Sequence, residues 1–169
     1  MNEREQILEI LRKAYQIEVD GYTFYSMTAT QATKPAVREL FEKLAHDEVL
    51  HQNFLKGVGK RYDAEGTAAF AVAKPVAALS GLTDHVFTAR FKEQAKGAAF
   101  EMGVLSVGLT LETNAMAYFN HAADATDSAE ARNFYRYLAD WEKQHFDALN
   151  ALYSAIRSDF WGAGGFAPF

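Results

Sequence analysis

The chain of 169 residues contains no cysteine. This absence excludes disulfides, thiolate nucleophiles, zinc sites with Cys ligands and iron centres held by Cys within the chain. Proline is scarce as well, with three residues, and the abundant Ala, Leu, Glu and Lys favour helix. Positive charge is also in deficit. Because 17 basic side chains face 22 acidic ones, the net charge is −5 and offers no basic surface for a nucleic acid.

Long apolar runs are missing too. The longest apolar-leaning run, residues 98–111, is too short for a transmembrane helix and contains a Glu. The N-terminal residues 1–6 are charged and lack the apolar region and cleavage site of a signal peptide. Hydrophobic residues make up 49% of the chain and charged residues 23%, which is ordinary globular composition. We therefore expect a soluble, cytoplasmic protein with one domain.

Apolar residues recur at helical spacing in four stretches of the chain. The four stretches cover residues 3–32, 35–59, 93–125 and 127–158. Short junctions at Pro35 and at Asp127-Ser128 separate the first stretch from the second and the third from the fourth. Since short junctions join antiparallel helices, the sequence predicts an all-α fold. Two helical hairpins, 3–59 and 93–158, are expected to form a four-helix bundle.

The segment between the hairpins, residues 60–92, has no sustained apolar period and contains Gly and Pro. It is predicted to be a long crossover with one or two short helical turns. Residues 159–169 are predicted to be a tail, and the Gly-rich sequence from Trp161 onward is expected not to hold a helix. The bundle is thus placed in residues 1–158.

The two hairpins match each other when the chain is shifted by 94 residues. The shift pairs identical residues along both helices, among them Leu11 with Leu105, Glu18 with Glu112, Arg38 with Arg132, Leu44 with Leu138, Glu48 with Glu142, His51 with His145 and Leu55 with Leu149. Aromatic positions pair as well, Phe24 with Tyr118 and Tyr25 with Phe119. The sequence therefore predicts a duplicated helical hairpin.

The pattern Glu-x-x-His occurs twice, and each copy is preceded by another Glu, 30 residues before its own Glu. The six residues involved are Glu18, Glu48, His51, Glu112, Glu142 and His145. Each lies in an apolar stripe of its predicted helix, so its side chain is expected to face the core. Small residues one turn from the single glutamates leave space there: Ala14, Gly21, Gly108 and Ala115.

Four ionised carboxylates in one core would destabilise it by on the order of several kcal/mol per charge unless cations neutralise them. Two divalent cations supply the balancing charge, and two neutral imidazoles complete the coordination. Carboxylate oxygen together with imidazole suits Fe, Mn or Zn, and a bridging Glu favours a dinuclear site. The sequence therefore predicts two metal ions in the core, bridged by Glu48 and Glu142.

The sequence resembles the ferritin-like di-iron carboxylate proteins and, among them, the rubrerythrins, over nearly all of residues 3–157. The motifs that carry the resemblance are Ala14-x-x-x-Glu18-x-x-Gly21-x-x-Phe24-Tyr25 and Leu44-Ala45-x-Asp47-Glu48-x-x-His51. The resemblance implies a ferritin-like bundle with a centre of two Fe ions, for which Mn or Zn are possible substitutes. The ligands that it implies are Glu18, Glu48, His51, Glu112, Glu142 and His145. Tyr25 matches a tyrosine near the metals in that family.

Two features differ from the usual rubrerythrin pattern. Rubrerythrins usually carry a rubredoxin domain with four Cys, and this chain has no Cys. They also tend to have an extra Glu three residues after the third-helix ligand, and a Glu in place of the second His. This chain has Ala115 and His145 at those positions. Its ligand set is the symmetric one of bacterioferritin-type sites.

Polar residues beside the motifs have both a functional and a structural interpretation. Asp47 is expected either to accept a hydrogen bond from the non-ligating nitrogen of His145 or to be solvated. Tyr22 and Tyr25 are expected either near the metals or in ordinary core packing. Glu101 is expected to be exposed at a helix start, and the lining of an access path is the alternative.

The resemblance implies a rubrerythrin-like oxidoreductase that reduces peroxide or dioxygen, as in defence against oxidative stress. Iron(II) oxidation with iron handling, as in ferritins, and a purely structural metal site are the alternatives. The chain has no motif for a flavin, a nicotinamide or a haem, so electrons are expected from an external donor such as a rubredoxin-like carrier. We also expect a homodimer or higher homo-oligomer, and neither a nucleic acid nor a membrane as a partner.

Overall fold

The structure is a computed structural model that describes residues 2–71, 85–95 and 99–163. Its elements are α1 (Glu3–Gln31), α2 (Pro35–Glu65), the 3-10 helix η1 (Gly66–Ala71), α3 (His85–Ala95), α4 (Ala99–Ala125) and α5 (Ala129–Ala163). The prediction of an all-α fold is confirmed.

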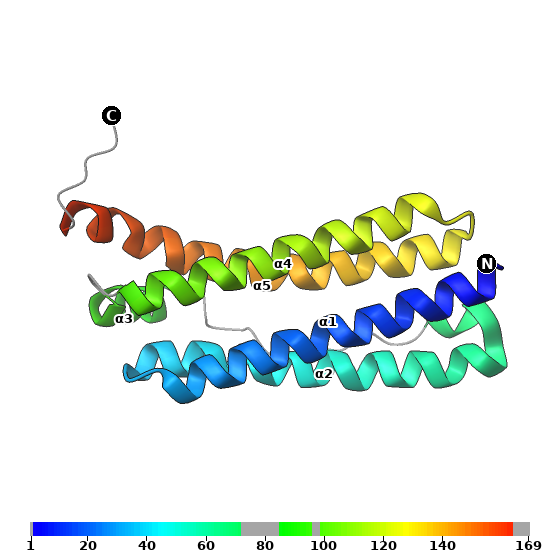
Figure 1. Cartoon of the computed structure of the whole chain (residues 1–169), viewed down its shortest axis with the longest axis horizontal. Coiled ribbons are helices and arrows are strands. Elements are labelled where there is room, and N and C mark those ends of the chain that lie inside the picture. Colours follow the sequence, from blue (N-terminus) through cyan, green and yellow to red (C-terminus); the bar gives the residue numbers. More distant parts are fainter. Residues whose placement is uncertain (1, 72–84, 96–98, 164–169) are drawn as a thin grey trace.

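The four long helices are paired as in a ferritin-like bundle. Helix α1 packs along α2, and α4 packs along α5. Figure 1 shows these two hairpins lying side by side along the long axis of the molecule. The short helix α3 contacts both α2 and α5 and so connects the hairpins at one end of the bundle.

Local sequence signals set several helix ends. The Asn2 side chain accepts a hydrogen bond from the Glu5 amide at 2.9 Å, and the Asn2 amide donates to the Glu5 carboxylate at 3.0 Å, which forms a capping box at the start of α1. Pro35 occupies the first turn of α2, where its missing N–H costs nothing. The Ser128 hydroxyl accepts from the Ala131 amide at 3.2 Å and caps α5. Gly66, with φ of 60°, ends α2 in a backbone conformation that glycine adopts without strain.

Helix α2 is longer than its sequence predicted, because it ends at Glu65 instead of residue 59. Val58 and Tyr62 are buried in the core and continue the apolar face of the helix beyond the predicted end. The glycines at positions 57 and 59 do not stop the helix.

The predicted crossover also contains more helix than expected. Helix α3 spans 11 residues, and its Phe87, Phe91 and Ala95 recur every four residues on a buried face. The Gln94 side chain accepts a hydrogen bond from the Ala36 amide at 2.9 Å, which satisfies a free N–H in the first turn of α2. The third long helix accordingly begins at Ala99 rather than at residue 93. Residues 72–84 of the crossover lie outside the described residues.

The end of α5 differs from the prediction as well. The helix continues beyond Ser158 to Ala163, through Trp161, where a non-helical tail was expected. Extending an existing helix adds a backbone hydrogen bond for each residue without a new nucleation cost, so residues of low helix propensity are included. The remainder of the predicted tail, residues 164–169, lies outside the described part of the chain.

The buried apolar residues form two clusters, one toward each end of the bundle. Along α2, Leu44 belongs to one cluster and Leu55 to the other. Along α5 the order is reversed, with Leu138 in the second cluster and Leu149 in the first. The turns between these leucines carry the polar residues of both Glu-x-x-His motifs, so the site lies at mid-bundle with a packed core on either side.

None of the helices in the described part of the chain is long and apolar enough to cross a membrane.

Candidate metal centre

All four long helices contribute polar side chains to the middle of the bundle. Glu18 comes from α1, Glu112 from α4, and each of α2 and α5 contributes a Glu and a His three residues apart, which places both on one helix face. None of the six predicted ligands is more than 3% exposed. Buried carboxylates at this density require partners, because desolvation disfavours their charged form.

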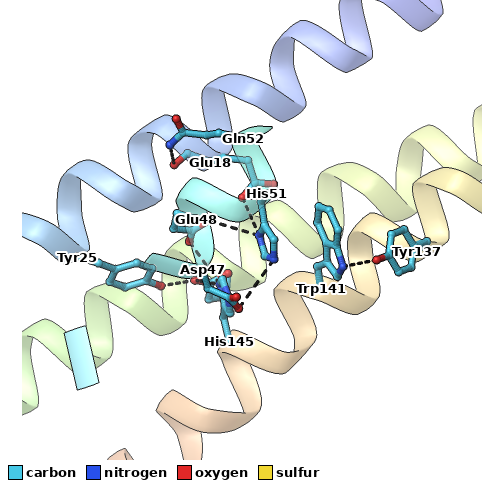
Figure 2. Close-up of polar contacts among 10 residues, drawn as sticks. Glu18, Tyr25, Asp47, Glu48, His51, Gln52, Tyr137, Trp141 and His145 are labelled. Atoms are coloured by element: carbon cyan, nitrogen blue, oxygen red, sulfur yellow. Dashed lines mark hydrogen bonds and ion pairs between the residues drawn. The ribbon is translucent and has the colours of Figure 1, made fainter. Parts of the chain in front are cut away.

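The first close group consists of Glu18, Glu48 and His51. The Nδ1 atom of His51 lies 3.1 Å from Glu18 Oε2 and 3.6 Å from Glu48 Oε2. One potential ligand atom from each residue falls within 4.8 Å of the others, which is compatible with a single shared cation. Figure 2 shows Glu18 and His51 converging from α1 and α2.

The second close group consists of Glu48, Glu112 and His145. The Nδ1 atom of His145 lies 3.3 Å from Glu48 Oε1 and 3.5 Å from Glu112 Oε1. Glu48 therefore directs one carboxylate oxygen to each histidine, Oε2 to His51 and Oε1 to His145. A carboxylate shared in this way between two donor groups has the arrangement of a bridging ligand.

Glu142 is also buried, at 1% exposure, but it belongs to neither close group among the described residues. It lines the same cavity as Glu48 and Glu112. The bridging role of Glu142 stays a prediction.

The unpaired buried atoms of the predicted ligands indicate that these residues suit a cation. Four buried atoms of the predicted ligands have no hydrogen-bond partner in the described part of the chain: Glu18 Oε1, Glu48 Oε2, Glu142 Oε1 and His145 Nδ1. Buried polar atoms are nearly always paired in native proteins. Carboxylate oxygen and imidazole nitrogen are donors that iron, manganese and zinc accept, so bound metal ions would satisfy these atoms.

Asp47 lies near the Nε2 atoms of both histidines. Its Oδ2 atom lies 3.0 Å from His145 Nε2 and 3.9 Å from His51 Nε2. When Nε2–H of His145 donates to this carboxylate, the Nδ1 lone pair of the same ring is left for a metal ion. The contact with His145 shows that Asp47, at 1% exposure, is not a solvated side chain. Its role in holding the tautomer for a metal stays a prediction.

Of the two tyrosines considered from the sequence, only Tyr25 reaches the centre. Its ring is completely buried, and its hydroxyl, which points into the centre in Figure 2, donates a hydrogen bond to Glu112 Oε1. Burial, followed by the charges of Glu112 and Glu48, raises the pKa of Tyr25 well above its usual value. Tyr22 meets neither expectation, the place near the metals or the core packing, because it is 42% exposed in a groove between the outer faces of α1 and α2.

The expectation that Glu101 is exposed is also wrong. Its side chain is buried and pairs with Lys34 Nζ at 3.3 Å. This ion pair joins the start of α4 to the turn between α1 and α2. The sequence of α4 alone does not show that the other hairpin covers this residue.

Sequence reasoning missed two residues that touch the centre. The Trp141 ring stacks on His51, with ring centroids 4.0 Å apart and an interplanar angle of 5°. The Gln52 amide donates to the backbone oxygen of Glu18 at 3.1 Å (Figure 2). A signal for Trp141 was available, because the shift of 94 residues pairs it with Asp47.

Without metal, the centre holds protons. Burial raises the pKa of Glu18 to about 7 and that of Glu48 to about 8, and it raises the pKa of Glu142 well above its usual value. Burial would also raise the pKa of Glu112, but the positive charge of His145 and the hydrogen bond from Tyr25 outweigh it and lower that pKa. Burial would lower the pKa of His145, but Glu48 and Glu112 outweigh it and raise it well above normal.

A cavity of about 270 Å³ connects the centre to the outside between α1 and α4. Its inner wall includes Glu48, Glu112 and Glu142, and its outer wall includes Lys13, Asp20 and Tyr118. Gly21 also lines it, and a Cβ at that position would lie 2.6 Å from Glu48 Oε1. The predicted space beside Glu18 thus exists, and the Glu48 carboxylate uses it.

A comparison with protein-family models matches residues 9–153 to the model described as Rubrerythrin. No curated protein and no solved structure matches the chain.

We predict that Gly21→Ala weakens metal binding. The added methyl group collides with the Glu48 carboxylate, which must then leave its position between the two histidines. We expect affinity for iron(II) or cobalt(II) to fall by about 10–100-fold, as when the support of a ligand is lost. Titration monitored by absorbance or calorimetry measures this change. Gly103→Ala is the matched control, because a Cβ there meets nothing within 4 Å, and equal affinity of the two variants would contradict the prediction.

We also predict that the metal-free protein becomes less stable as pH rises from about 5 to about 8. In this range Glu18, Glu48, Glu142 and His145 bind protons more tightly in the folded chain than in the unfolded one. The folded state then holds the excess protons, so the free energy of unfolding falls with rising pH.

Urea denaturation of the metal-free protein at several pH values, followed by circular dichroism, tests this slope. Glu48→Gln should flatten it, because the amide does not titrate. With metal bound the slope should reverse, since the ligands must lose their protons to bind the ion. Stability of the metal-free protein that is constant or rises over this range would contradict the assignment.

Proposed function

Because the chain belongs to the rubrerythrin family, we propose that its buried carboxylate–histidine centre holds two iron ions and reduces peroxide or dioxygen with electrons from an external carrier. The observation that carries the proposal is the position of Glu48, which directs one oxygen to His51 and the other to His145. Two donor groups that share a carboxylate form a site for two cations rather than one.

In the proposed centre, Glu18 and His51 hold one ion, Glu112 and His145 hold the other, and Glu48 and Glu142 lie between them. Four carboxylates balance the charge of two divalent ions, and the imidazoles add no charge when their Nε2–H groups are directed toward Asp47. Manganese or zinc would satisfy the same donors, but zinc has no redox chemistry, and iron is the metal that membership of the rubrerythrin family favours.

When bound, the two iron ions would supply the electrons that reduce peroxide to water. The side chains of the protein would shape the access path and hold the ligands in place. Ile17 and Leu111 make the wall of the cavity partly apolar, and its size suits a small oxidant. Tyr25 holds Glu112 in place through its hydroxyl. The protons on the metal-free carboxylates must leave before the ions bind.

Iron(II) oxidation linked to iron handling is the second candidate. The observation in its favour is His145, which completes a symmetric ligand set where rubrerythrins usually have a Glu. The same cavity would then admit iron(II) to the three carboxylates of its inner wall, Glu48, Glu112 and Glu142. A homodimer or higher homo-oligomer suits either candidate and stays a prediction, as does the rubredoxin-like carrier.

We predict that the protein binds two iron ions per chain and that the ligand variants fall into two classes. Glu48→Ala and Glu142→Ala should each lower the content at both positions, since a bridge contacts both ions. Glu18→Ala and Glu112→Ala should each remove about one ion. Elemental analysis after anaerobic loading with iron(II) and desalting counts the ions. One ion or fewer in the unmodified protein, or equal losses in all four variants, would show that the bridging assignment is wrong.

We predict that turnover requires a separate electron donor. The chain has no Cys and no motif for a second redox cofactor, so iron(II) protein mixed with hydrogen peroxide should be oxidised once and then stop. Addition of a rubredoxin with its reductase should restore cycling, measured as continuous consumption of the nicotinamide. Cycling with a nicotinamide and peroxide alone would reveal another redox centre. Oxidation of the bound iron no faster than that of free iron(II) by either oxidant would end the peroxidase proposal.

A further inference from the structure

The two halves of the centre are equivalent in position but differ in chemistry. The shift of 94 residues pairs Asp47 with Trp141, each directly before a Glu of the Glu-x-x-His motif. Asp47 contacts the histidine of the other half, His145, through a hydrogen bond. Trp141 also contacts the histidine of the other half, His51, but by ring stacking at 4.0 Å. One histidine is therefore supported by a carboxylate and the other by an oxidisable indole.

In a second pair of equivalent positions, again only the residue that contacts the half with Glu112 and His145 forms a side-chain hydrogen bond with the centre. Tyr25 donates a hydrogen bond to Glu112, whereas its counterpart Phe119 has no hydroxyl to donate. The half that contains Glu112 and His145 is thus held by hydrogen bonds from both sides. In the other half, the contact of His51 with Trp141 leads away from the centre through aromatic rings.

The aromatic contacts continue from Trp141 to the surface. Trp141 is 3% exposed, and its Nε1–H donates a hydrogen bond to the Tyr137 hydroxyl at 2.7 Å. The two ring centroids lie 4.9 Å apart, and Phe54 packs against both rings. Figure 2 shows Trp141 between His51 and Tyr137. Tyr137 is partly exposed in a recess of about 240 Å³, whose wall also includes Phe54 and Phe134.

We propose that Trp141 and Tyr137 form a one-electron relay between the metal centre and this surface recess. The relay rests on the proposed function, since its oxidant is hydrogen peroxide at the iron-loaded centre. Indole and phenol are the side chains of this chain that lose one electron most readily. Electron transfer between rings in contact is fast, because electronic coupling falls steeply with distance.

The relay acts when the metal centre can supply only one of the two electrons that hydrogen peroxide needs. Reduction of hydrogen peroxide to two water molecules takes two electrons and two protons. If the centre held one oxidisable iron(II), this ion would supply one electron, and the second would come from Trp141 through its stacked contact with His51. Tyr137 then returns one electron to Trp141 and releases its phenolic proton to solvent, while the indole keeps its N–H. The two protons that peroxide needs come from solvent, and since Tyr137 has released one to solvent, the net uptake is one proton. The phenoxyl radical of Tyr137 then takes one electron and one proton from a surface reductant such as ascorbate.

The hydrogen bond between the two residues has the direction that this step needs. Because Nε1–H of Trp141 donates to the Tyr137 oxygen, the phenolic proton points away from the indole. Burial raises the pKa of Tyr137 to about 12 although the hydrogen bond from Trp141 lowers it, so the hydroxyl is protonated before it is oxidised.

Freeze-quenched electron paramagnetic resonance of the full chain, loaded with one equivalent of iron(II) and mixed with hydrogen peroxide, tests the relay. The unmodified protein should give a phenoxyl radical that ascorbate removes. Tyr137→Phe should replace this signal by an indole radical, and Trp141→Phe should abolish both. Tyr153→Phe, on the same helix and also partly buried, is the matched control and should keep the phenoxyl signal.

Mass spectrometry of the protein after excess peroxide gives a readout that does not depend on turnover. Oxidation products should accumulate on Trp141 and Tyr137 in the unmodified chain, and Trp141→Phe should protect Tyr137. Tyr137→Phe removes only a hydroxyl from a partly exposed ring, so it keeps the test valid if Trp141→Phe fails to fold.

The possible failures are distinguishable. A phenoxyl signal that persists in Tyr137→Phe would overturn the relay. Rapid oxidation of bound iron by peroxide with no protein radical, or with the same radical in every variant, would overturn the relay and leave the proposed function intact. If bound iron reacts no faster than free iron(II), the proposed function fails and the relay fails with it.

Discussion

The cost of burying carboxylates in an apolar core is the constraint on which the rest of this structure depends. Glu18, Glu48, Glu112 and Glu142 lie at mid-bundle with no more than 3% exposure, and several of their atoms have no partner among the described residues. Desolvation disfavours their ionised forms, so the metal-free centre keeps protons instead of charges. Bound cations would resolve both problems at once, since they would neutralise the charge and occupy the unpaired oxygens.

Two apolar clusters, one on either side of the centre, stabilise the fold and offset the free-energy cost of the buried carboxylates. They hold all four helices in register while the middle turn of each stays polar. Gly21 supplies the space for the Glu48 carboxylate, because any larger residue would collide with it. Asp47 directs the ring of His145 through a hydrogen bond. The side chains that would bind the ions are therefore held in position by their neighbours, which is how proteins orient metal ligands.

Duplication explains the symmetry of the ligands, and divergence after it explains the differences around them. A repeated hairpin places a Glu and a Glu-x-x-His motif from each half around one axis. Asp47 and Trp141 occupy equivalent positions in the two halves, yet one forms a hydrogen bond and the other stacks. In the proposed centre, similar ligands in different surroundings would give the two ions different electronic environments, which is a basis for proposing different tasks for them.

The sequence by itself determined the four long helices, the duplicated hairpins and which residues face the core, because these follow from local periodicity and from the 94-residue shift. Only the tertiary structure decided what depends on contacts between distant segments. Glu101 is buried because Lys34 from the other hairpin reaches it, and Tyr22 is exposed because it lies at the edge of the buried face of α1. Helix α3 is stabilised because Phe87 and Phe91 pack into the apolar core. The stack of Trp141 on His51 joins residues 90 positions apart. A periodic pattern predicts the face of a helix, but which neighbour that face meets is set by the packing of whole helices.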